Sequence, residues 1–165
     1  MCGIAGFAGR GDEPHLRAMT AALSHRGPDG EGFYVDPEQP VFLGHRRLAV
    51  IDIAGGTQPM WNEDHSVAVV FNGEIYIHAE LRQKLLARGH KFRSDHSDTE
   101  VLVHGYEEWG TAFPAMLNGM FAFVIYDRRR QQLFLARDRF GEKPLFYCSD
   151  RGFFGFASEL KSLVQ

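Results

Sequence analysis

The sequence predicts an α+β domain in which two mainly antiparallel β-sheets pack together with helices outside them. Runs such as 67–71 and 120–126 are apolar throughout and have the length of a strand, which is typical of strands covered on both faces. Only a few segments show helical spacing, and the last third of the chain is mostly strand. With 165 residues, 44% of them apolar, we expect one domain over 1–165 with a substantial core.

The chain opens with a predicted strand and a predicted helix. Residues 3–9 are small and apolar, which is typical of a buried strand that other backbone approaches closely. Such a strand would hold Cys2 rigidly at its tip. Apolar residues then recur at helical spacing and predict a helix over 14–25, which a turn at 27–30 ends. A short strand over 33–35 is expected next.

The middle of the chain is predicted to contain further strands separated by a loop. Residues 41–53 are interpreted as one or two strands joined at 44–47. Residues 54–65 are rich in glycine, proline and asparagine, so we expect an irregular loop there. The apolar run 67–71 forms a predicted strand that ends at Asn72.

Two longer helices are predicted after this strand. Residues 78–88 carry inward-facing leucines four residues apart, and Gly89 is expected to end the helix. Asp98 is of a residue type that caps helix N-termini, and it precedes a predicted helix over 98–109. A short helical piece is expected over 111–117.

The C-terminal third is predicted to be mostly strand. Residues 120–126 and 133–136 flank a polar linker, which favours a hairpin. Strands over 145–148 and 153–157 follow, and a final helix is expected to begin at Ser158.

The first residues hold the candidate reactive group. An initiator methionine is normally removed when a small residue follows it, so the mature chain is expected to begin at Cys2. That residue would then carry a thiol and a free α-amino group, whose unperturbed pKa of about 7.7–8.0 suits a general base. One residue would supply both nucleophile and base. The alternative is that Cys2 is an ordinary small apolar residue at the start of a strand.

Polar residues at strand ends are candidates for the rest of a site. If Cys2 attacks a carboxamide, the side-chain amide of Asn72 and the backbone N–H of Gly73 are candidate donors to the oxyanion. Arg47 and Asp98 are candidates for binding the carboxylate and the ammonium of an amino-acid substrate. The alternatives are a turn at Asn72, a surface cation at Arg47 and a helix cap at Asp98.

Histidines give two other hypotheses. His25 or His45 would be the base in a Cys–His dyad, and His96, Asp98 and His104 would be metal ligands. Neither set has the spacing of a known motif, so no metal is predicted. The sequence also lacks the glycine-rich loops that bind ATP or NAD.

Charge and cysteine content exclude several classes of partner. A net charge of −3 gives no electrostatic case for nucleic acid or an anionic membrane surface. The two cysteines, Cys2 and Cys148, form no disulfide framework, and thiol chemistry at Cys2 requires a reducing compartment. No apolar segment of 18 residues and no signal peptide are seen, so a cytoplasmic protein is expected.

Six short motifs occur together in order along the chain. They are MCGI at 1–4, HRGPDG at 25–30, GHRRL at 44–48, FNGEIY at 71–76, SDTE at 97–100 and RDRFGEKPL at 137–145. In these motifs the chain resembles the class II glutamine amidotransferases, and most of all the glutaminase domain of glutamine-hydrolysing asparagine synthetases. The resemblance implies the N-terminal nucleophile hydrolase fold, a four-layer αββα sandwich.

The resemblance also implies roles for single residues. Cys2 matches the family's nucleophile, with its own α-amino group as base, while Asn72 and Gly73 match the oxyanion hole. Arg47 matches the residue that binds the α-carboxylate of glutamine, and Asp98 matches one near the α-amino group.

The same resemblance assigns the surroundings of the pocket. Glu74 matches a second group near the α-amino nitrogen of the substrate. Pro28 and Asp29 fall in a loop that, by this resemblance, supports the pocket and takes no part in the chemistry. The backbone that lines the pocket in such domains corresponds here to Leu48, Val50 and Ile51.

The resemblance implies a larger reaction than this chain is expected to perform. Members of the family continue into a synthetase domain with an ATP-pyrophosphatase motif, which is absent from the sequence, so a fragment is expected. L-glutamine is the expected substrate, with no cofactor in this domain and with ATP and Mg²⁺ only in the synthetase domain. The ammonia would pass to that domain or to a separate acceptor. The alternative is a glutamine-binding or regulatory module that is inactive without its partner.

Overall fold

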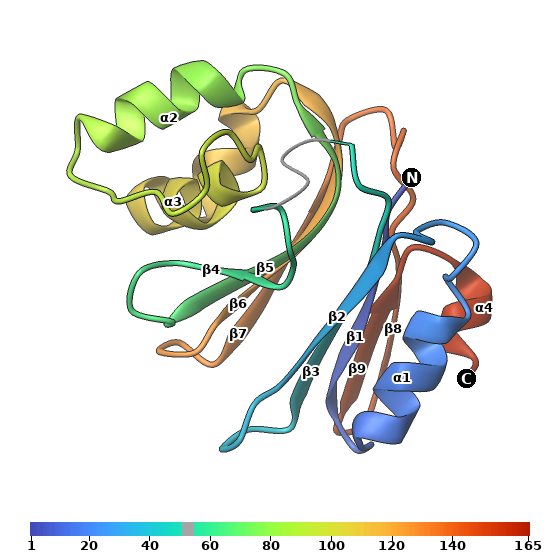
Figure 1. Cartoon of the computed structure of the whole chain (residues 1–165). Helices are drawn as coiled ribbons and strands as arrows, with labels where there is room; N and C mark the ends of the chain where they lie inside the picture. Colours follow the sequence, from blue (N-terminus) through green and yellow to red (C-terminus); the bar gives the residue numbers. More distant parts are fainter. Residues whose placement is uncertain (51–54) are drawn as a thin grey trace.

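The computed structural model of the chain describes residues 1–50 and 55–165 (Figure 1). Its strands are β1 (Gly3–Gly9), β2 (Gly30–Val35), β3 (Val41–Arg47), β4 (Met60–Trp61), β5 (Val67–Ile75), β6 (Gly119–Asp127), β7 (Gln132–Arg137), β8 (Phe146–Asp150) and β9 (Phe153–Ala157). Its helices are α1 (Glu13–Ala21), α2 (His78–Leu86), α3 (Glu100–Trp109) and α4 (Leu160–Leu163), with a 3₁₀ helix η1 (Gly110–Met116).

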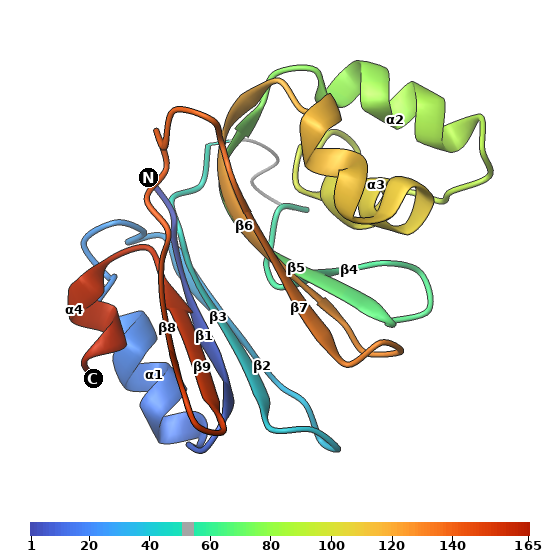
Figure 2. The same cartoon turned by 180° about the vertical axis from the view of Figure 1, so that it is seen from behind.

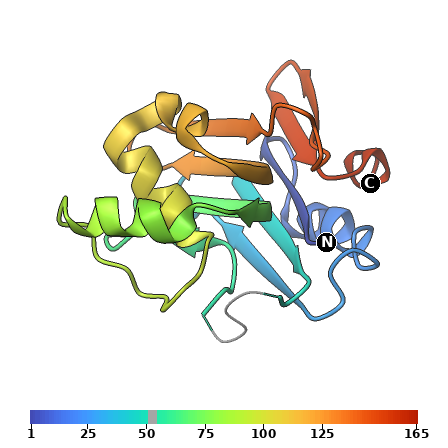
Figure 3. The same cartoon turned by 90° about the horizontal axis from the view of Figure 1, so that it is seen from above.

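The strands form two sheets that pack face to face between layers of helices. One sheet has the order β2-β3-β1-β9-β8 and the other β4-β5-β6-β7, and all the paired strands described are antiparallel. Helices α1 and α4 lie outside the first sheet and α2 and α3 outside the second (Figures 1 and 2). Seen from above, the two pairs of helices lie on opposite sides of the molecule (Figure 3). The predicted αββα sandwich is confirmed.

Three apolar cores fill the spaces between these layers. One lies between α1 and the five-stranded sheet, and another between the four-stranded sheet and helices α2 and α3. The core between the two sheets includes Ile4, Leu43, Val70, Val124 and Phe156. Burial of each large apolar side chain contributes about 1.5–3 kcal/mol, so this contact fixes how the sheets face each other.

Two strands differ in extent from the sequence prediction. Of the one or two strands expected over 41–53, a single strand β3 forms and runs unbroken through 44–47, because Gly44 and Arg46 pair in register with Ala5 and Gly3 of β1. β5 likewise continues past Asn72 to its end, paired along its whole length with β6. The expected loop over 54–65 contains the short strand β4, and residues 51–53 of the predicted strand lie outside the described part of the chain.

Most helices begin and end near the predicted positions, but α1 ends at Ala21, four residues before the predicted end at 25. α1 is capped by Asp12, whose side chain accepts a hydrogen bond from the backbone N–H of His15. The prediction that Asp98 caps α3 is wrong, because the helix begins at Glu100 without a side-chain cap. Asp98 instead accepts a hydrogen bond from the backbone N–H of Ile75 at 3.1 Å. Among the described helices, none combines the length and the apolar character needed to cross a bilayer.

Candidate active site

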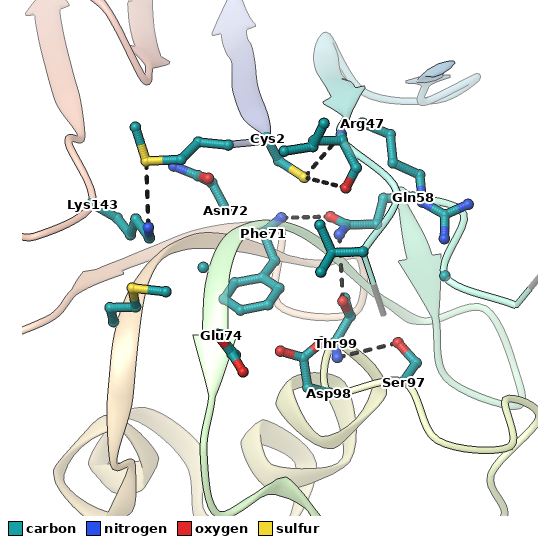
Figure 4. Close-up of a pocket in the computed structure, with 16 residues that line it drawn as sticks. Cys2, Arg47, Gln58, Phe71, Asn72, Glu74, Ser97, Asp98, Thr99 and Lys143 are labelled. Atoms are coloured by element: carbon teal, nitrogen blue, oxygen red, sulfur yellow. Dashed lines mark hydrogen bonds between the residues drawn. The ribbon is translucent and has the colours of Figure 1, made fainter. Parts of the chain in front are cut away.

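Strand alternation turns Cys2 and Asn72 toward the same space. Ile4 and Val70 lie in the core between the sheets, and side chains two residues apart on a strand point to the same face. Cys2 immediately precedes β1 and Asn72 lies in β5, so both extend this face toward the end of the sandwich where the chain begins (Figure 1). Figure 4 shows the two side chains near each other at one pocket.

The pocket between the sheet ends has a volume of about 240 Å³. This is below the roughly 300–1,000 Å³ typical of sites for drug-sized ligands, so the pocket suits a small molecule. Ile51 lies outside the described residues. The predicted site residues that line the pocket are Cys2, Arg47, Leu48, Val50, Asn72, Gly73, Glu74 and Asp98.

The thiol of Cys2 is held by the backbone of Leu48. The Leu48 N–H donates to Sγ at 3.4 Å, and Sγ lies 3.6 Å from the Leu48 carbonyl oxygen. Burial raises the pKa of the Cys2 thiol, although the Leu48 N–H, the chain-terminal ammonium and Arg47 act in the opposite direction. The thiol is therefore mostly protonated at neutral pH, and a base is needed to make it a nucleophile.

Arg26 fixes the backbone of the same residue. Its Nε donates to the carbonyl oxygen of Cys2 at 2.9 Å, and its Nη1 donates to Glu159 at 2.9 Å. Burial works against ionisation of Glu159, but hydrogen bonds from Arg26 and His25 outweigh it and lower the pKa of Glu159 to about 2. The pair stays ionised and ties the start of β1 to the residue before α4. No role was predicted for Arg26 from the sequence, although it lies in the HRGPDG motif.

The amide of Asn72 is an unpaired donor. The residue is 1% exposed, and its Nδ2 has no hydrogen-bond partner among the described residues. Leaving such a group unpaired costs about 1–3 kcal/mol, which a ligand acceptor in the pocket would offset. The neighbouring Gly73 accepts no side chain, because a Cβ there would lie 2.1 Å from the carbonyl oxygen of Met120. The glycine therefore permits the close approach of β5 and β6 beside the pocket.

Asp98 provides a buried carboxylate on the far wall of the pocket. It is 5% exposed, and the backbone N–H of Ile75 is its hydrogen-bond donor. Burial raises the pKa of Asp98, and the nearby Glu74 adds to the rise. A buried, incompletely paired carboxylate of this kind favours binding of a cation.

Asp29 supports the segment that carries Arg47 and Leu48. Its backbone N–H donates to the carbonyl oxygen of Arg47 at 3.0 Å, and its Oδ2 accepts from the backbone N–H of Ala49 at 2.8 Å. These bonds fix the end of β3, where Arg47 reaches the pocket (Figure 4).

Two further residues of the pocket were missed by the sequence analysis. Gln58 accepts from the backbone N–H of Phe71 at 2.6 Å and donates to Thr99 at 3.4 Å, so it joins β5 to the segment before α3. Lys143 is 7% exposed, and its Nζ lies 3.4 Å from the sulfur of Met1. Lys143 belongs to the RDRFGEKPL motif, whereas nothing in the sequence distinguishes Gln58.

The histidine hypotheses find no support in this geometry. Neither His25 nor His45 is among the described residues that line the pocket. His25 pairs with Glu159 at 2.9 Å, and burial lowers the pKa of His45 to about 3. His96 lies beside Asp95 instead of joining Asp98 and His104 in a metal site.

Comparison with known families decides what kind of domain this is. The family model described as a glutamine amidotransferase domain matches residues 1–165. The chain belongs to this family.

The curated relatives of this amidotransferase domain are much longer proteins. Asparagine synthetase [glutamine-hydrolyzing] 3 of Bacillus subtilis is 43% identical over 171 residues, which cover 99% of the chain and 27% of that protein. Asparagine synthetase [glutamine-hydrolyzing] 2 of the same species is 45% identical, over 100% of the chain and 22% of that protein. The first such synthetase of Arabidopsis thaliana is 44% identical, over 88% of the chain and 25% of that protein. The chain spans about a quarter of the length of these relatives.

Solved structures confirm the fold of the amidotransferase domain. Glutamine phosphoribosylpyrophosphate amidotransferase from B. subtilis superposes with a TM-score of 0.79 at 23% identity, covering 99% of this chain and 43% of that one. A second structure, described as the allosteric regulatory enzyme of purine biosynthesis, gives a TM-score of 0.80 at 25% identity with the same coverages. The predicted N-terminal nucleophile hydrolase fold is confirmed.

Proposed function

We propose that this domain hydrolyses L-glutamine to glutamate and ammonia, with Cys2 as the nucleophile. The observation that carries the proposal is the placement of the Cys2 thiol and the unpaired Asn72 amide at one small pocket of a glutamine amidotransferase domain. A nucleophile and a donor for the developing oxyanion are the two groups that amide hydrolysis requires first.

The proposed reaction begins after removal of Met1, which gives Cys2 a free α-amino group. This amine takes the thiol proton while sulfur attacks the side-chain amide carbon of glutamine, and the carbonyl oxygen becomes an oxyanion. Asn72 Nδ2 and the Gly73 N–H are its proposed donors. Cleavage of the C–N bond returns the proton to the departing nitrogen, so ammonia leaves and a γ-glutamyl thioester remains. Water then hydrolyses the thioester, releasing glutamate and restoring the thiol.

The charged ends of the substrate would be held by Arg47 at the end of β3 and by the two carboxylates on the wall opposite Cys2. We assign the α-carboxylate of glutamine to Arg47, whose guanidinium suits a planar carboxylate. We assign the ammonium to Asp98 and Glu74, the two carboxylates that line this wall. Each charged hydrogen bond contributes about 1.5–3 kcal/mol, enough to discriminate free glutamine from glutamine within a peptide.

The fate of the ammonia is a further part of the proposal. The curated relatives are named as glutamine-hydrolysing asparagine synthetases, which supports delivery to a synthetase domain that amidates a carboxylate. We place ATP and Mg²⁺ with that partner, because the sequence of this chain has no glycine-rich phosphate loop.

Ammonia release and calorimetry on the same preparation test the proposed function. We expect glutamine to bind with 1:1 stoichiometry and to release ammonia and glutamate in equal amounts. Binding without release would indicate a glutamine-binding module instead of a hydrolase. Absence of both binding and release would refute the assignment of glutamine as ligand.

Asp98→Asn is expected to weaken glutamine binding about 10- to 150-fold, the equivalent of one charged hydrogen bond. Titration calorimetry at pH 7.5 measures the loss. The melting temperature should not fall, because the substitution removes a buried charge that the unliganded domain does not fully pair. Asp95→Asn is the matched control, since the Asp95 side chain is 95% exposed only three residues away. Unchanged affinity in Asp98→Asn would exclude Asp98 from the ammonium site.

The pH dependence of binding is expected to follow the same carboxylate. Because burial raises the pKa of Asp98 above its usual 3.8, the free domain takes up this proton at a higher pH than an exposed aspartate would. Only the ionised form pairs with the ammonium of glutamine, so affinity should fall as the pH drops through this raised value. Asp98→Asn should remove that part of the pH profile. A profile unchanged by the substitution would assign the titration to another group.

A further inference from the structure

A second group of titratable side chains lies outside the pocket, on the helix-covered side of the four-stranded sheet. Glu63 comes from the turn between β4 and β5, His90 from the connection after α2, and His104 from α3. One potential ligand atom from each of the three lies within 4.8 Å of the others. None of them is among the described residues that line the Cys2 pocket.

Glu107, one turn after His104 on α3, adds a fourth oxygen to this group. Its Oε2 lies 3.1 Å from His104 Nδ1 and 3.8 Å from His90 Nδ1. Glu63 Oε2 lies 3.8 Å from the same nitrogen of His104. A tetrahedral zinc ion with bonds of about 2.0–2.1 Å holds its ligand atoms about 3.4 Å apart. The three nitrogen–oxygen distances, 3.1, 3.8 and 3.8 Å, lie on both sides of that value.

Both carboxylates are oriented by bonds to their other oxygen. Glu63 Oε1 accepts from the backbone N–H of Lys91 at 2.8 Å. Glu107 Oε1 accepts from Asn62 Nδ2 at 2.6 Å. Each carboxylate therefore has one oxygen hydrogen-bonded to the protein and the other directed at the imidazoles. Carboxylates that bind metals are oriented in the same way, by hydrogen bonds from groups that do not themselves touch the ion.

The two imidazoles have carboxylates on their far sides. His90 Nε2 lies 3.3 Å from Glu108, and His104 Nε2 lies 3.7 Å from Glu100 Oε1. His104 is fully buried, and its Nε2 has no hydrogen-bond partner among the described residues. A carboxylate behind the far nitrogen of a histidine favours the tautomer whose near nitrogen binds a metal.

We propose that Glu63, His90, His104 and Glu107 form a binding site for a divalent transition-metal ion, with zinc as the best chemical match. Imidazole nitrogens and carboxylate oxygens are ligands that zinc shares with cobalt and nickel, and four such ligands are the number that zinc prefers. The ion also offsets the negative charge gathered around two imidazoles. It ties the β4–β5 turn and the α2–α3 connection to α3, so its role is structural.

The alternative is that these side chains bind no metal and that a protonated His104 is held between the carboxylates. The two arrangements are separated by zinc titration of a chelator-treated Cys2→Ala/Cys148→Ser chain, in which no thiol competes for the ion. We expect one zinc ion per chain by calorimetry and a higher melting temperature with zinc than without. Cobalt in place of zinc should give the visible spectrum of a tetrahedral nitrogen and oxygen site.

Substitutions of accessible ligands make the test specific. His90→Ala and Glu107→Gln should weaken zinc binding at least about 10-fold and remove the thermal stabilisation, since each loses one of four ligands. His96→Ala is the control, because this exposed histidine lies on the same connection and should leave zinc affinity unchanged. Absence of zinc binding, or binding that His90→Ala leaves intact, would overturn the proposal. Equal loss in His96→Ala would assign the ion to exposed histidines and also overturn it.

Discussion

Cys2→Ala is expected to reduce ammonia release from glutamine by at least about 10³-fold, because loss of the nucleophile removes the whole covalent route. Glutamine affinity should change little, since the groups assigned to its charged ends lie on other strands and loops. The substitution keeps the melting temperature close to that of the parent, because the small apolar side chain occupies the same half-buried position. Stopped ammonia assays and calorimetry on one preparation measure both quantities.

Cys148→Ala is the matched control for this experiment. Cys148 is the other free cysteine of the chain, and it is exposed on β8, away from the pocket. Activity should be retained in this variant. Substantial ammonia release from Cys2→Ala would mean that another group attacks the substrate.

Asn72→Ala is expected to lower kcat about 10²- to 10³-fold with little change in KM, the usual effect of removing one oxyanion donor. The effect falls on kcat because the amide bonds an oxygen whose charge develops only in the transition state. Folding should be largely retained, because Nδ2 has no hydrogen-bond partner within residues 1–50 and 55–165 that the substitution would leave unpaired. Steady-state ammonia kinetics over a range of glutamine concentrations separate the two constants.

Asn118→Ala provides the comparison for this prediction. Asn118 is an exposed asparagine immediately before β6, and its backbone carbonyl accepts a hydrogen bond from the backbone N–H of Tyr76, just after β5. Its side chain should therefore be dispensable. An Asn72→Ala variant that loses affinity while retaining kcat would make Asn72 a substrate-binding residue and not an oxyanion donor.

Local patterns predicted the strands well because each strand carries its own signal. The apolar runs that became β5 and β6 are buried on both faces, and this burial is visible in the residues themselves. The sequence left open whether 41–53 forms one strand or two joined at 44–47, and no joint forms because Gly44 meets a partner strand and Thr20 of α1, not a turn. A glycine that permits close packing and a glycine that permits a turn look alike in a sequence.

Most of the pocket residues that the sequence predicted fall within recognisable motifs. Asp98 was expected either to bind substrate or to cap a helix. The sequence could not separate these roles, because an aspartate just before α3 suits both. The uncapped start of α3 at Glu100 and the bond to Ile75 show that the carboxylate is not a cap. Arg26 and Gln58 were missed because their partners are distant, at Glu159 and Phe71, and pairing across the fold leaves no local pattern.

The N-terminus offers the most direct test of the proposed chemistry. Two preparations are compared, one that begins at Cys2 and one that keeps a short uncleaved extension before it, with intact mass establishing each end. We expect equal melting temperatures and ammonia release only from the chain that begins at Cys2, because only there do thiol and amine belong to one residue. Full ammonia release from the extended chain would contradict it.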